Sequence, residues 1–133
     1  MPESTLAKKL LLKAGQRAAI LNPPAGYQLG PLGPLPSNVT VLNTLEEPLD
    51  FVQLFVRSGK EVAALIPAVM RALKPDGLLW VSYPKGSSGV DTDLNRDILW
   101  KMMQTFGLAG IAMVSIDSVW SAIRLRPAER VGK

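Results

Sequence analysis

The side chains best suited to hold a small ligand fall directly after the apolar runs of this 133-residue chain. Arginine and lysine attract anions, while hydroxyls and amides hydrogen-bond to phosphates and sugars. Backbone amides at the start of a helix add a further anion site. Because ligands bind outside the carboxyl ends of the strands in open parallel sheets, these positions meet at one edge. We therefore expect a pocket for a small anionic or nucleotide-like molecule lined by Asn22, Gly26, Tyr27, Arg57, Ser58, Lys85, Ser87 and Ser88.

The same residues also suit purely structural roles. Ser58 and Glu61 have the spacing of a capping box, in which side-chain oxygens bind the free amides at a helix start. Lys85 suits a solvated surface, and residues 86–89 suit a polar loop. Both interpretations stay open on the sequence alone.

Acidic residues offer a second kind of chemistry. Asp91, Asp93 and Asp97 have a spacing that brings two carboxylates to one helical face, where a metal ion can bind. Arg96 and Lys101 suit ordinary surface pairing with them instead, and carboxylates are favoured in a first helical turn. The chain contains no cysteine and no histidine, which excludes thiolate catalysis, Ser–His arrangements and cysteine-ligated metals. We therefore expect no catalytic residue and no metal site, and the sequence favours a binding protein over an enzyme.

Composition indicates a single globular domain over residues 1–133, since 47% of the residues are hydrophobic and 20% are charged. No apolar run approaches the roughly 18 residues that cross a bilayer, so we expect a cytoplasmic protein without a membrane partner. The formal charge of +4 is spread along the chain, which argues against a specific nucleic-acid partner.

A homo-oligomeric interaction module is the alternative to a ligand-binding protein. Residues 23–38 are rich in proline and glycine, and Leu29, Leu32 and Leu35 recur every third residue, as on one side of an extended ribbon. These leucines suit the cover of a sheet face that lacks a helix, or a contact between copies. The edge strand expected near Trp120 is a second candidate contact.

Apolar periodicity and turn residues divide the chain into helices and strands. Two of the strands are apolar on both faces, which indicates a parallel sheet covered by helices. The expected helices span 4–14, 58–74 and 91–106, and the expected strands span 18–21, 39–42, 50–56, 78–83, 111–116 and 119–125. The last two strands are close enough in sequence to form an antiparallel hairpin.

The segment from Leu73 to Ser82 reads L-K-P-D-G-L-L-W-V-S. It resembles the L-K-P-G-G-x-L-x-[VI]-S segment that leads into the fifth strand of class I S-adenosylmethionine-dependent methyltransferases, and the order of elements around it is similar too. More closely, the chain resembles small bacterial proteins that carry a cut-down methyltransferase-like sheet and have no assigned activity. The resemblance implies a Rossmann-like three-layer α/β sandwich, mostly parallel, with an antiparallel closing hairpin and missing elements.

The first cofactor motif of that family is altered in this chain. The family has an acid and a glycine-rich turn after its first strand, whereas this chain has Asn22, Pro23 and Pro24. Only Gly26 falls on a family glycine. Prolines remove the backbone donors that close contact with a cofactor needs.

The acid that closes the family's second strand and holds the ribose is altered as well. Asn43 and Thr44 stand at that position, and Glu46 and Glu47 follow a step later. The resemblance thus implies the family's sheet without its cofactor residues. We therefore expect no cofactor, S-adenosylmethionine included, while a divergent methyltransferase stays as a further alternative.

Overall fold

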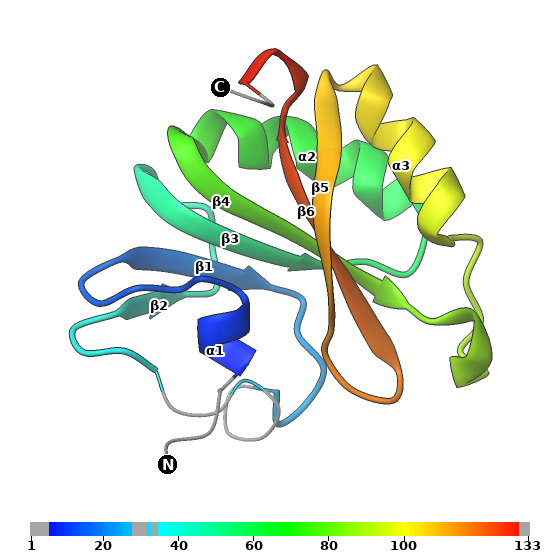
Figure 1. Ribbon diagram of the computed structural model, residues 1–133, viewed down its shortest axis with the longest axis horizontal. Helices are drawn as coiled ribbons and strands as arrows, with labels where there is room; N and C mark the ends of the chain where they lie inside the picture. The colour runs from blue at the N-terminus through cyan, green and yellow to red at the C-terminus, as the bar shows by residue number, and fades with distance from the viewer. Residues whose placement is uncertain (1–5, 28–31, 33–34, 131–133) are drawn as a thin grey trace.

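A mixed sheet forms the centre of the protein in a computed structural model, which describes residues 6–27, 32 and 35–130 (Figure 1). The strands within these residues are β1 (Arg17–Leu21), β2 (Thr40–Leu42), β3 (Leu49–Phe55), β4 (Leu73–Pro84), β5 (Leu108–Ser115) and β6 (Trp120–Pro127). They lie in the order β2-β1-β3-β4-β6-β5. The first four run parallel, and the β5–β6 hairpin adds two antiparallel strands beside β4.

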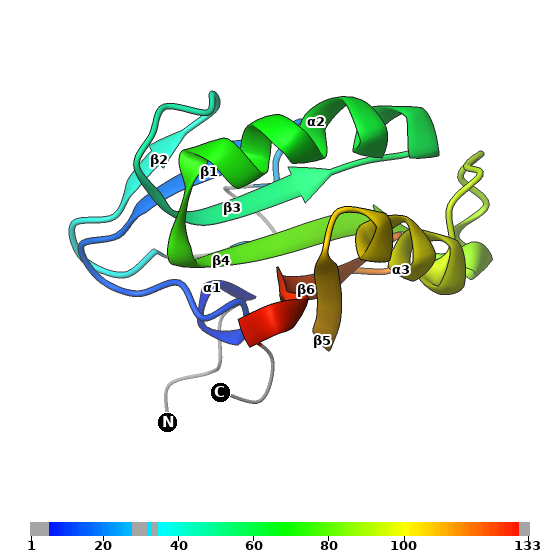
Figure 2. The same ribbon diagram turned by 90° about the horizontal axis from the view of Figure 1, so that it is seen from above.

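Helices on both faces of the sheet make three layers (Figure 2). α2 (Gly59–Ala72) and α3 (Arg96–Thr105) pack on one face, and α1 (Leu6–Lys9) packs on the other. Two short 3₁₀-helices, η1 (Gly86–Ser88) and η2 (Ala128–Arg130), follow β4 and β6. The expected Rossmann-like α/β sandwich with a closing hairpin is confirmed.

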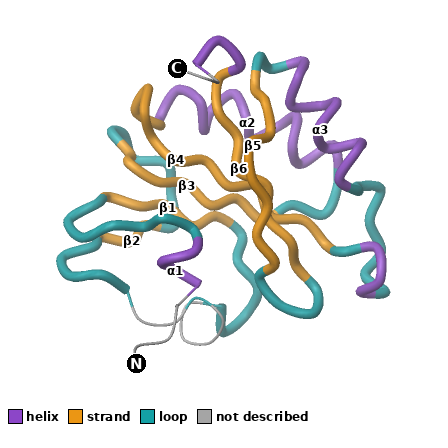
Figure 3. The backbone as a smooth tube through the Cα atoms, in the orientation of Figure 1, coloured by secondary structure: helices purple, strands orange, loops and turns teal. Residues whose placement is uncertain are grey.

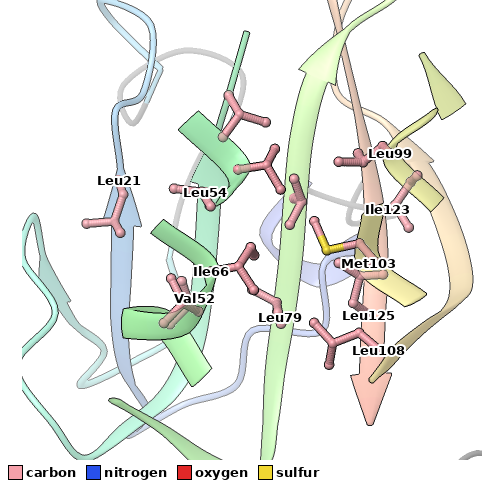
Figure 4. Packing of buried hydrophobic residues seen from close by; sticks show 14 of the residues in the cluster. Leu21, Val52, Leu54, Ile66, Leu79, Leu99, Met103, Leu108, Ile123 and Leu125 are labelled. Atoms are coloured by element: carbon pink, nitrogen blue, oxygen red, sulfur yellow. The ribbon is translucent and has the colours of Figure 1, made fainter. Parts of the chain in front are cut away.

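Apolar side chains fill both faces of β3. Val52 and Leu54 belong to the core beneath α2 and α3, part of which is drawn in Figure 4. Phe51 and Phe55 belong to the core on the α1 side. Because the strand is buried on both faces, its sequence is almost continuously apolar, which is the signal that predicted a covered parallel sheet.

The proline- and glycine-rich segment after β1 contributes to the core on the α1 side. Leu32 is fully buried there, so its expected role as a cover for the sheet is confirmed. Leu35 is 39% exposed, which contradicts the same expectation for that side chain. Leu29 lies outside the described residues.

α1 ends earlier than predicted. The expected helix spans 4–14, whereas α1 ends at Lys9, and residues 1–5 lie outside the described part of the chain. The N–H of Leu11 donates to the carbonyl of Lys8 (2.9 Å), and the N–H of Leu12 donates to that of Ala7 (3.0 Å). Leu11 takes the left-handed conformation (φ 66°) that this helix-ending pattern requires.

β4 begins earlier than predicted, because it starts directly after α2. Leu73 pairs with Leu49 of β3, and the next paired residue, Leu78, lies opposite Phe51. The four residues from Lys74 to Gly77 therefore bulge out of the ladder opposite a single residue of β3. The Lys-Pro-Asp-Gly turn of the sequence is this bulge.

The C-terminal part differs from expectation in two places. α3 begins at Arg96 with Asn95 as its N-cap, not at Asp91 or Thr92. The Thr92 hydroxyl instead donates to the carbonyl of Arg57, which ties the segment before α3 to the start of α2. The strand near Trp120 is not at the edge, because β6 lies between β4 and β5.

Candidate functional site

The carboxyl ends of the parallel strands β1, β3 and β4 meet at one edge of the sheet, where the loops that follow them leave it (Figure 3). All of the predicted site residues lie in these three loops. Open α/β sheets bind their ligands at this edge. This edge is therefore the candidate functional site. Some of the predicted residues are exposed there, and others hold the surrounding loops in place.

The loop after β1 exposes its backbone. Asn22 and Gly26 are both exposed and both take positive φ angles, 56° and 75°. The N–H of Tyr27 donates to the carbonyl of Pro24 (3.1 Å), so residues 24–27 form a tight turn with Gly26 at its third position. The space in front of Gly26 is open, since a Cβ atom built there meets nothing within 4 Å.

Tyr27 points away from this open edge and into the core. Its side chain is 2% exposed, and its hydroxyl donates to Oε1 of Gln53 (2.6 Å). Nε2 of Gln53 donates in turn to Oγ of Ser82 (3.1 Å). Burial raises the pKa of Tyr27 far above its ordinary value. Tyr27 therefore anchors the loop after β1. The polar Gln53 inside an otherwise apolar strand is the sequence signal for this buried role, and the prediction missed it.

The N-terminus of α2 is bound by the chain's own side chains. Oγ of Ser58 accepts a hydrogen bond from the N–H of Glu61 (3.2 Å), which confirms the predicted cap. The Glu61 carboxylate accepts from the N–H of Arg57 (2.8 Å). The Asp93 carboxylate accepts from the N–H of Gly59 (2.9 Å), at the position where an external anion was expected. The guanidinium of Arg57 stays exposed at this edge, with its Cζ 5.6 Å from the centre of the Trp120 ring.

The residues after β4 hold the β5–β6 hairpin. Nζ of Lys85 donates to Oγ of Ser115 (2.7 Å) and to the carbonyl of Asp117 (2.6 Å). The Ser88 hydroxyl donates to the carbonyl of Lys85 (2.7 Å). Ser87 belongs to η1 beside it. Lys85 and Ser88 therefore position loops at the edge.

Glu46, which the sequence places past the second strand, lies in the connection from β2 to β3. The Thr44 hydroxyl, two residues past β2, donates to Oε2 of Glu46 (3.3 Å). The guanidinium of Arg17 donates to the main-chain carbonyl of Glu46 (3.3 Å), which steadies this connection. Glu46 is exposed. Glu46 therefore lies beside the start of β1, at the edge opposite the carboxyl ends of the strands.

The three aspartates considered for catalysis do not converge. Asp93 binds the start of α2, and Asp97 makes an exposed pair with Arg96 (3.5 Å). Among the described residues, no three acidic side chains are grouped closely enough to hold a metal ion. In that same part of the chain, the helices are too short or too polar to cross a bilayer.

Comparison with known proteins identifies the fold. No protein-family model and no curated protein matches the sequence. Solved structures do match, among them a SAM-dependent methyltransferase from Aquifex aeolicus, with a TM-score of 0.64, 15% identity, and coverage of 90% of this chain and 86% of that one. DhpI bound to SAH has a TM-score of 0.64, 13% identity, and coverage of 92% and 82%. A SAM-dependent methyltransferase from Thiobacillus denitrificans, in complex with S-adenosyl-L-homocysteine, has a TM-score of 0.59, 13% identity, and coverage of 92% and 89%.

These comparisons correct the prediction that S-adenosylmethionine is not a cofactor. Solved structures of the same fold hold S-adenosylmethionine or its demethylated product, so the fold is compatible with this cofactor. The carboxyl edge presents the open backbone at Gly26 and the exposed cation Arg57. The chain has a truncated class I methyltransferase-like fold.

Proposed function

We propose that this protein binds an adenosine-bearing ligand of the S-adenosylmethionine type at the carboxyl edge of its sheet. The observation that carries the proposal is the strand order β2-β1-β3-β4-β6-β5 with its first four strands parallel. This order gathers the ends of three neighbouring strands where folds of this kind take a nucleotide.

Different residues at that edge suit different parts of the ligand. The exposed turn at Gly26 lets a ligand approach the main chain without a side chain in between. The Arg57 guanidinium suits the carboxylate of a methionyl group. Bound S-adenosylmethionine supplies an electrophilic methyl group. The bonds of Tyr27, Lys85 and Ser88 hold the surrounding loops in place.

Binding without chemistry is the function proposed here. The chain has no histidine and no cysteine to serve as a base or nucleophile. Tyr27 is buried and bonded to Gln53, which makes it a poor proton acceptor. Asp93 is bonded to the start of α2.

Calorimetric titration tests the proposal. S-adenosylmethionine and S-adenosylhomocysteine should bind, and inorganic phosphate alone should not. Arg57→Met should weaken binding by about tenfold or more, because a hydrogen bond to a charged group contributes about 1.5–3 kcal/mol. Arg71→Met, at the exposed C-terminal end of α2, is the matched control. Absence of binding by both adenosyl compounds at millimolar concentration would refute the proposal.

A second candidate function is self-association through the edge strand β5. Ile98, Trp100, Ile111 and Met113 are between 37% and 46% exposed, and all belong to α3 or β5. Trp100, Ile111 and Met113 also line a cavity of about 250 Å³. An edge strand offers unpaired backbone groups, and β5 carries no charged side chain that would discourage pairing.

Light scattering across a concentration series tests self-association. We expect the mass of a dimer for the natural chain and of a monomer for Met113→Lys, since an inward or flanking lysine protects sheet edges. Gln104→Lys on the exposed side of α3 is the matched control. A monomer mass for the natural chain at all concentrations would eliminate this candidate.

A further inference from the structure

A second cavity, of about 470 Å³, lies at the opposite edge of the sheet, where the parallel strands begin. Its charged lining residues are Lys13, Asp50, Lys74 and Arg124, and Leu11 and Leu78 provide apolar walls. This volume falls within the range of about 300–1,000 Å³ that is usual for pockets for small organic ligands. None of the described residues that line the cavity belongs to the carboxyl edge.

The bulge in β4 builds one wall of the cavity. Lys74 to Gly77 leave the ladder opposite Asp50, so the chain projects from the sheet there. Gly77 makes this path possible, because a Cβ atom on it would lie 2.5 Å from Cδ1 of Leu73 and 3.1 Å from the carbonyl oxygen of Lys74. The turn that follows α1 forms the facing wall, where the Gln16 side chain accepts from the N–H of Lys13 (2.9 Å).

The charges in this cavity are unbalanced. Among the residues that the structure describes, the one carboxylate in the lining is Asp50, which is already used on both oxygens: Oδ1 pairs with Nζ of Lys74 (2.8 Å), and Oδ2 accepts from the N–H of Arg17 (2.9 Å). Within the described residues, Lys13 and Arg124 make no salt bridge. The cavity therefore presents two cations that no described residue pairs in a salt bridge.

Arg124 is the less well satisfied of the two. Its Nε atom is buried and has no hydrogen-bond partner among the described residues. Burial, together with the nearby Arg126, lowers the pKa of its guanidinium. Leaving a buried donor unpaired is unfavourable, and an anion paired with the guanidinium would offset that cost.

Leu11 is a second, independent irregularity at the same place. It occupies the left-handed position after α1 (φ 66°), where glycine is strongly favoured, and its side chain is 41% exposed although it is apolar. Left-handed backbone is unfavourable for a residue with a side chain. Such strain is commonly retained where the side chain serves a ligand.

We propose that this cavity binds a small organic anion, in which a carboxylate or phosphate group is attached to an apolar body. The oxyanion pairs with Arg124 and Lys13, and the apolar body packs between Leu11 and Leu78. This site is separate from the one proposed for an adenosyl ligand and does not depend on it.

Titration of the ¹⁵N-labelled protein in an NMR experiment tests the site. Benzoate and phenyl phosphate are the probes, benzyl alcohol lacks the charge, and inorganic phosphate lacks the apolar body. We expect at least one organic anion to shift the amide signals of Gln16, Asp50 and Gly77 while leaving those of Asn22 and Gly26 unchanged. Equal shifts with benzyl alcohol or inorganic phosphate, or no shifts at millimolar concentration, would overturn the proposal.

Three variants make the test specific. Arg124→Met and Lys13→Met should each weaken the better probe by about tenfold or more, the equivalent of about 1.4 kcal/mol. Lys101→Met, on the exposed surface of α3, should leave its affinity unchanged. Leu11→Gly should weaken binding while stability against urea stays equal or rises, a combination that a merely structural leucine would not produce. Unchanged affinity in Lys13→Met and Leu11→Gly would overturn the proposal even if Arg124→Met fails to fold.

Discussion

The Asp93 carboxylate accepts a hydrogen bond from the backbone N–H of Gly59 at 2.9 Å, although the two residues are 34 positions apart. The contact joins the segment before α3 to the first turn of α2. It also places a negative charge at the positive end of the α2 dipole. The start of α2, which the sequence predicts as a site for an external anion, is therefore occupied by a carboxylate of the same chain.

Removal of the Asp93 carboxylate should destabilise the fold. Asp93→Ala loses both the hydrogen bond to Gly59 and the favourable charge, so we expect a loss of about 1 kcal/mol in the free energy of unfolding. Urea denaturation measures this loss. Asp91→Ala is the control, because that exposed residue lies just outside the contact. Equal effects of the two substitutions would show that the contact does not stabilise α2.

The buried chain of hydrogen bonds from Tyr27 through Gln53 to Ser82 should also be costly to break. Tyr27→Phe leaves Oε1 of Gln53 without its donor inside the core, and an unsatisfied buried acceptor costs about 1–3 kcal/mol. Adding Gln53→Leu to Tyr27→Phe should cost less than the sum of the two single changes, since both act on one contact. Thermal or urea unfolding of the four proteins gives these values, and strict additivity would contradict the coupling.

The sequence predicts the elements that carry local signals. The expected strand 50–56 and helix 58–74 agree closely with β3 (Leu49–Phe55) and α2 (Gly59–Ala72). Double burial and the capping residues of α2 are visible in the sequence itself. The end of α1 was misplaced, because Leu11 takes a conformation that residue preferences assign to Gly15.

The candidate site was less predictable, since its contacts join distant parts of the chain. Lys85 reads as a free cation, but its partners Ser115 and Asp117 come from a hairpin about thirty residues later. Glu46 reads as an acid just past the end of β2, but its main-chain carbonyl accepts from Arg17 at the start of β1. Such contacts depend on how β2, β4 and the hairpin are placed, and residue spacing alone does not give that placement.

Gly77 should tolerate no side chain in the bulge of β4. In Gly77→Ala, the new Cβ would lie 2.5 Å from Cδ1 and 2.7 Å from Cγ of Leu73, so the bulge must shift. We expect a loss of about 1–3 kcal/mol, as for other overpacked sites. Gly86→Ala is the matched control, because a Cβ there meets nothing within 4 Å. Comparable unfolding free energies for the two variants would contradict the close packing at Gly77.

The ion pair of Asp50 and Lys74 should make the free energy of unfolding depend on pH. Hydrogen bonds from Lys74 and from the N–H of Arg17 lower the pKa of Asp50 in the folded protein. When folding lowers the pKa of a carboxyl group, the charged group stabilises the folded protein at pH values above its unfolded-state pKa of about 3.9. This stabilisation is lost as the pH falls below that pKa. The Lys74 side chain is 49% exposed, so solvent screening limits the contribution to about 1 kcal/mol or less.

Asp50→Asn isolates this contribution. The variant should be less stable than the natural chain at neutral pH, and the difference should shrink as the pH is lowered below about 4, because protonated Asp50 and asparagine are then both uncharged. Urea denaturation at a series of pH values measures the difference. Asp97→Asn removes an exposed carboxylate that is 3.5 Å from Arg96, and it should leave the acid dependence close to that of the natural chain. A stability difference for Asp50→Asn that stays constant from neutral to acid pH would mean that the Asp50 charge does not stabilise the start of β3.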